Sequence, residues 1–216
     1  MKNNTIDAKL LNAQVALENA QGNQAVKSAL ALFGYDEVKL AAGQTLYEEA
    51  ITKQNLQKQE YGEQYSATDA LDATLSLANN VYMRHVKVAR VALKDQRGAW
   101  QALDLQGRRK KTYSGWVKQA RVFYSNALAS TDIQTALATF GMTEAILTDS
   151  LAKVEDVESK LAAQLKEKGE AQDATQTRDA AFEKLEDWIS DFVAISRIAL
   201  EDQPQYLEML GIVEPS

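Results

Sequence analysis

The stretch Ala29-Leu30-Ala31-Leu32-Phe33-Gly34 returns 107 positions later as Ala136-Leu137-Ala138-Thr139-Phe140-Gly141. The same shift continues without a gap and aligns Gly62-Glu63 with Gly169-Glu170. About 29 of the 109 aligned pairs are identical, where this alanine-rich composition gives roughly 8 by chance. Because glycines and turn residues coincide as well as alanines, we interpret the chain as an internal duplication. The first repeat covers residues 1–107 and the second covers 108–216, and we expect them to form one compact domain.

The composition favours long helices and excludes several kinds of site. The chain has 216 residues, of which two are proline and ten are glycine, and so few helix breakers are typical of an all-helical protein. The absence of cysteine excludes disulfides, thiolate zinc sites, iron–sulfur clusters and cysteine nucleophiles. A single histidine excludes any site that needs two imidazoles.

The location is predicted to be cytoplasmic. The first residues lack the apolar core of a signal peptide, and no run of about 18 apolar residues is present that could span a bilayer. The formal net charge of -6 is ordinary for such a protein and argues against nucleic-acid binding over the whole surface. The net charge does not exclude a local basic patch, so nucleic acid is an unlikely partner but is not excluded.

Each repeat is predicted to contain one helical hairpin. Gly34 and Gly141 are typical of residues that end a helix. A long helix is then expected from Glu37 to Gly62 and again from Glu144 to Gly169. Variant capping boxes at residues 66–69 and 173–176 predict a second long helix in each repeat, antiparallel to the first. With the shorter elements this makes five helices per repeat, and we expect an all-α fold in which two hairpins form a pseudo-twofold four-helix bundle with short capping helices.

Such hairpins predict one structural ion pair in each repeat. An antiparallel turn near residue 64 brings Glu37 opposite Arg90, and the second repeat brings Glu144 opposite Arg197. The alternative is that the two arginines bind an anionic ligand.

The most informative asymmetry is the basic segment 84–121. It holds about 11 lysines and arginines against two aspartates, a local charge near +9. Its candidate anion-binding residues are interleaved with Tyr113 and Trp116 and comprise Arg108, Arg109, Lys110, Lys111, Lys118 and Arg121. The simpler interpretation, which we favour at this stage, is a solvated linker between the repeats.

No residue is predicted to be catalytic, to ligate a metal or to bind a cofactor. His85 aligns with Phe192, which favours packing in the core over acid–base chemistry, although one histidine leaves both open. The sequence contains no glycine-rich phosphate loop, nucleophile elbow or paired-aspartate metal motif.

Several short segments resemble an uncharacterised family of bacterial all-helical proteins with a duplicated helical-hairpin unit. They are Phe33-Gly34-Tyr35-Asp36, Gly62-Glu63-Gln64, Ile195-Ser196-Arg197-Ile198-Ala199-Leu200 and Asp202-Gln203-Pro204. The resemblance implies a helical duplicated fold and no activity. Our first functional hypothesis is therefore a non-enzymatic structural or protein-interaction bundle with a protein partner or a second copy of itself. The alternative is an anion-binding or nucleic-acid-binding module that uses residues 84–121. We expect no membrane partner.

Overall fold

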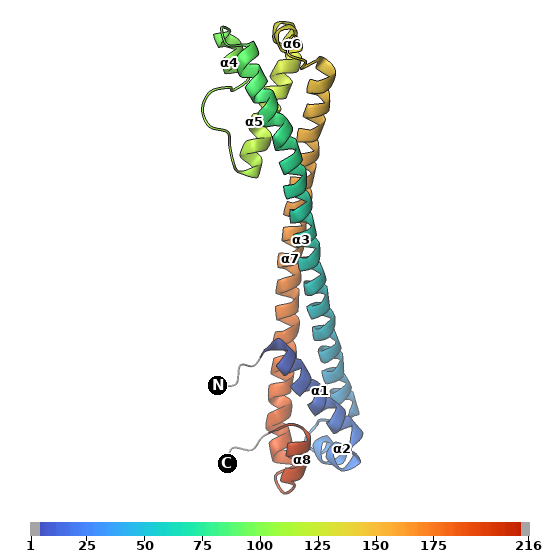
Figure 1. Cartoon of the computed structure of the whole chain (residues 1–216). Coiled ribbons are helices and arrows are strands. Elements are labelled where there is room, and N and C mark those ends of the chain that lie inside the picture. Colours follow the sequence, from blue (N-terminus) through green and yellow to red (C-terminus); the bar gives the residue numbers. More distant parts are fainter. Residues whose placement is uncertain (1–4, 213–216) are drawn as a thin grey trace. The chain divides into compact units, whose positions relative to one another are not determined.

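The computed structural model describes residues 5–212, and these form helices and no strand (Figure 1). The all-helical prediction is therefore confirmed. The eight helices of the described residues are α1 (Ile6–Gly22), α2 (Gln24–Ala31), α3 (Glu37–Ala92), α4 (Arg97–Ala102), α5 (Tyr113–Ala129), α6 (Thr131–Ala138), α7 (Glu144–Ala199) and α8 (Pro204–Met209). None of them is both long enough and apolar enough to cross a bilayer.

Each of the first four helices has a counterpart of equal length 107 positions later. Helices α1 and α5 have 17 residues, α2 and α6 have 8, α3 and α7 have 56, and α4 and α8 have 6. The turns after α2 and α6 match as well, because Gly34 and Gly141 have φ angles of 83° and 79°. Both glycines thus take the left-handed conformation that was predicted to end a helix.

The predicted breaks inside the long helices are wrong, because α3 and α7 are continuous. The hydroxyls of Ser66 and Thr68 do not cap a new helix. They donate hydrogen bonds to the carbonyl oxygens of Gly62 and Gln64, at 3.0 and 2.9 Å, one turn earlier in the same helix. A glycine costs a helix only about 1 kcal/mol relative to alanine, and the bonds of the neighbouring turns outweigh that cost. Among residues 5–212, each predicted repeat therefore has four helices and no hairpin turn.

The chain divides into two compact units that do not coincide with the two repeats. Unit 1 combines the residues up to Glu60 with those from Glu170 onward, and unit 2 runs from Tyr61 to Gly169. Helix α3 gives its first part to unit 1 and its second part to unit 2, while α7 does the reverse. Each unit is thus built from helices of both predicted repeats.

An aromatic cluster lies in the core of unit 1. The ring of Tyr35 has edge contacts with the rings of Trp188 and Phe192, with centroids 5.6 and 5.5 Å apart. Leu207 of α8 and Val26 of α2 belong to the same buried cluster. Tyr35 precedes α3, whereas Trp188 and Phe192 belong to α7, so this core joins the two repeats.

The core of unit 2 is built around Tyr82 of α3. Its fully buried ring lies 5.9 Å from Trp116, 5.6 Å from Phe123 and 6.1 Å from Tyr124, measured between centroids. All three partners belong to α5. Helix α5 is therefore held against the second part of α3 by aromatic packing.

The predicted ion pairs Glu37–Arg90 and Glu144–Arg197 do not form. Glu37 lies in the first turn of α3 and Arg90 in the last turn of the same helix, and Glu144 and Arg197 occupy the two ends of α7. Glu37 pairs instead with Lys27 of α2.

Arg90 has a different structural role. Its Nε and Nη2 donate to the carbonyl oxygen of Leu105 at 3.1 and 2.8 Å. This contact fastens the linker between α4 and α5, which carries residues 108–111.

Candidate anion-binding site

The linker between α4 and α5 borders a pocket of about 570 Å³ in unit 2, which we call the basic pocket. One wall is a face of α3, and the other is formed by the linker and the start of α5. The residues that line it are Asp72, Leu75, Ser76, Asn79, Met83, Arg109, Lys110, Lys111 and Trp116.

Backbone and amide contacts hold the linker in place. Asp104 has a φ of 46°, and its carboxylate accepts a hydrogen bond of 2.5 Å from Nε2 of Gln119. The Oε1 atom of the same buried Gln119 accepts one of 3.0 Å from the backbone N–H of Lys110. The lysine backbone is thus tied to α5, and its side chain is left to project from a fixed point.

Arg109 anchors the linker to the core. Its Nη1 donates to the hydroxyl of Tyr82 at 3.0 Å, and its Nη2 donates to the carbonyl oxygen of Gln106 at 2.7 Å. Burial raises the pKa of Tyr82, so the hydroxyl stays neutral and acts as an acceptor, although Arg109 opposes that shift. The Nε of Arg109 is buried and makes no hydrogen bond to any residue in the described range. The Nε–H of the guanidinium is therefore left without a hydrogen-bond partner among the described residues.

The charges of Lys110 and Lys111 are not neutralised inside unit 2. Both side chains are exposed, and neither forms an ion pair within residues 5–212. The carboxylate that lines the pocket, Asp72, accepts a hydrogen bond of 2.6 Å from the hydroxyl of Tyr113. The indole N–H of Trp116 donates to Asn79 at 2.9 Å. The pocket therefore combines two unpaired ammonium groups with an aromatic wall, a combination suited to an anion.

The structure separates the six predicted anion-binding residues. Arg109, Lys110 and Lys111 line the basic pocket, while Arg108 and Lys118 are exposed and do not. Arg121 pairs with Glu158 and lies 3.7 Å from a carboxylate oxygen of Glu155, both on α7, so it supports helix packing in unit 2.

Three further residues of this site, Asp72, Asn79 and Tyr82, were not predicted from the sequence. They lie on one face of α3 at helical spacing, but only the position of α5 reveals which residues complete that face.

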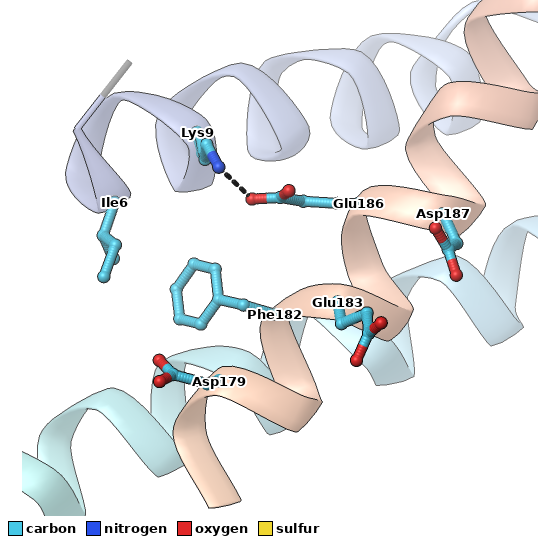
Figure 2. Close-up of a pocket in the computed structure, with 7 residues that line it drawn as sticks. All are labelled: Ile6, Lys9, Asp179, Phe182, Glu183, Glu186 and Asp187. Atoms are coloured by element: carbon cyan, nitrogen blue, oxygen red, sulfur yellow. Dashed lines mark hydrogen bonds and ion pairs between the residues drawn. The ribbon is translucent and has the colours of Figure 1, made fainter. Parts of the chain in front are cut away.

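Unit 1 has a pocket of about 290 Å³ at the equivalent place, which we call the acidic pocket (Figure 2). It is lined by Ile6, Lys9, Asp179, Phe182, Glu183, Glu186 and Asp187. The shift of 107 positions aligns Asp179 with Asp72, Glu183 with Ser76 and Glu186 with Asn79. Figure 2 shows Lys9 of α1 paired with Glu186 of α7.

The net charge of each unit has the same sign as the charge of its pocket. Unit 1 contains nine lysines and arginines against 18 aspartates and glutamates, a net charge of -9. Unit 2 contains 15 against 12, a net charge of +3. The modest charge of the whole chain therefore conceals two units of opposite sign.

His85 belongs to a buried polar cluster of unit 2 and does not line the basic pocket. Its Nδ1 lies 3.0 Å from the hydroxyl of Tyr124, which also interacts with Ser150. The aligned residues of unit 1 are Phe192, Leu17 and Gly43, none of which has a polar side chain. Burial, followed by the charges of Arg84 and Lys153, lowers the pKa of His85. The imidazole is therefore neutral in the folded protein at pH 7.

We predict that replacing His85 by phenylalanine weakens the dependence of stability on acid pH. A histidine whose pKa is lower in the folded state destabilises the fold once the pH falls below its unfolded value, about 6.5. Urea unfolding at pH 7.5 and pH 5.0 should show a smaller loss of stability for His85→Phe than for the natural chain. Ser150→Ala, which changes the same cluster without a titratable group, should keep the natural loss, and equal losses in all three proteins would contradict the prediction.

No protein-family model, curated protein or solved structure matches this chain.

Proposed function

We propose that the protein is a non-enzymatic interaction protein whose basic pocket binds carboxylate groups on an acidic protein surface. The observation that carries this proposal is the pair of unpaired ammonium groups of Lys110 and Lys111, which project from a linker tied to α3 and α5. Arg109 lines the same pocket and adds a third positive charge beside them. Fixed donors lose less conformational freedom on binding than lysines on a mobile segment.

The surroundings of the pocket favour a protein surface over nucleic acid. The neighbouring cation Arg121 is paired with glutamates, which leaves a short basic surface. The chain as a whole carries a net charge of -6, which repels a long polyanion. A short acidic segment needs only the basic pocket itself.

The proposal predicts a selective loss of binding in a charge-reversed pocket. Fluorescence anisotropy of a labelled oligoglutamate peptide at low salt should show at least about tenfold weaker binding for Lys110→Glu/Lys111→Glu than for the natural chain. The matched variant Arg108→Glu/Lys118→Glu changes the net charge equally but leaves the pocket lining intact, and it should keep most of the affinity.

Three results would overturn the proposed function. The first is an equal loss of peptide binding in both variants, since that would indicate an effect of net charge alone. The second is the absence of peptide binding by the natural chain at low salt. The third is a labelled single-stranded oligonucleotide that binds more tightly than the peptide, which would favour the nucleic-acid alternative.

We further propose that the chain arose by duplication of a 107-residue segment, with the long helices exchanged between the two units. Equal helix lengths at a constant shift and the matching turns at Gly34 and Gly141 support this proposal. A bacterial origin and a cytoplasmic location remain predictions of the sequence.

A further inference from the structure

We infer that the acidic surface bound by the basic pocket is the acidic pocket of a second copy of this chain. The inference rests on the proposed function and names the partner of the same site. It places Lys110 and Lys111 of one copy against the α7 face that carries Asp179, Glu183, Glu186 and Asp187 in another copy.

Unit 2 already shows how such a segment lies on such a face. Lys110 and Lys111 border the same pocket as Asp72, Ser76 and Asn79 of α3. The aligned positions of α7 carry Asp179, Glu183 and Glu186, so the helix face is equivalent but has two further carboxylates. The basic segment thus has a more favourable electrostatic partner in unit 1 of another copy than in its own unit.

The acids of this face form a row along α7. Asp179, Glu183 and Asp187 follow one another at intervals of four residues and project from one side of α7 over about 12 Å. The ring of Phe182, which Figure 2 shows between Asp179 and Glu186, lines the acidic pocket and offers an apolar surface for the alkyl part of a lysine side chain.

The acidic pocket and the basic pocket both carry charged side chains that form no ion pair within the described part of their own chain. Glu183 and Asp187 are exposed and form no ion pair among the residues that the structure describes, as is also true of Lys110 and Lys111. Glu186 and Asp179, by contrast, are paired with Lys9 and Arg178, respectively. A contact between two copies therefore gains new ion pairs without breaking those already formed within each chain.

The net charges of the two units favour this contact over a contact between two copies of the same unit. Two copies of unit 1, each with a net charge of -9, repel one another, whereas unit 1 of one copy attracts unit 2 of the next, whose net charge is +3. Association is therefore head to tail, and it closes as a reciprocal dimer or continues as a chain of molecules.

Sedimentation equilibrium of the full chain tests the inference. At about 25 mM salt the natural protein should show a mass that rises with concentration above the 23.9 kDa of one chain, and at about 500 mM salt it should be monomeric. Lys110→Glu/Lys111→Glu and Glu183→Lys/Asp187→Lys should each be monomeric at low salt. An equimolar mixture of the two variants should associate again, because the reversed charges are complementary. Glu201→Lys/Asp202→Lys, which changes two exposed acids of unit 1 outside the acidic pocket, should associate like the natural chain.

The possible outcomes distinguish a failure of the inference from a failure of the proposed function. A natural chain that is monomeric at low salt but binds the oligoglutamate peptide through Lys110 and Lys111 overturns the inference and leaves the proposed function standing. Association that survives both reversals, or that fails to return in the mixture, also overturns the inference. A chain that neither associates nor binds the peptide overturns both.

Discussion

Replacing Phe192 by alanine is expected to destabilise unit 1 by about 3–5 kcal/mol, the usual effect of removing a fully buried aromatic ring. The ring is stacked on Trp188 with centroids 5.2 Å apart, and it meets the edge of Tyr35 at 5.5 Å. Its removal therefore leaves a cavity where α7 meets the start of α3. Urea unfolding followed by circular dichroism measures the loss.

Phe33 provides the control for this experiment. It is a phenylalanine of the same unit, but 46% of its surface is exposed, so Phe33→Ala should change the free energy of unfolding by less than about 0.5 kcal/mol. Similar losses for Phe33→Ala and Phe192→Ala would contradict the described core.

The local signals in the sequence predicted the ends of the helices better than their continuity. Gly34 takes a left-handed conformation and Glu37 begins α3, as expected, because a helix end is decided by a few neighbouring residues. Gly62 was predicted to end a helix and does not. Its helix preference is worth only about 1 kcal/mol, and packing along the whole of α3 decides the outcome. That one misplaced turn produced the wrong hairpins and the wrong ion pairs.

Only part of the candidate site could be predicted, because its other residues are distant in the sequence. Consecutive cations at residues 108–111 are visible in the sequence, but the α3 residues beside them are about 25–40 residues away. Arg121 was grouped with these cations by proximity along the chain, although α5 turns it toward the glutamates of α7. Which charges remain unpaired is a property of the fold.

The exchange of helices between the units predicts which pieces of the chain fold alone. Every member of the buried cluster around Tyr82 lies between Leu71 and Val157, inside the continuous segment 61–169. The core of unit 1, by contrast, draws on residues near both ends of the chain, such as Leu17 and Phe182. The predicted repeat 1–107 therefore contains half of each core and neither one complete.

Urea unfolding of segment 61–169 beside segment 1–107 is the most direct test of this account. We predict that segment 61–169 is helical, unfolds cooperatively and binds the oligoglutamate peptide with the affinity of the full chain, because it contains the whole basic pocket. Segment 1–107 should show no cooperative transition. The opposite result, with a cooperatively folded monomer of residues 1–107 and an unfolded segment 61–169, would show that each repeat folds on its own and would contradict the account.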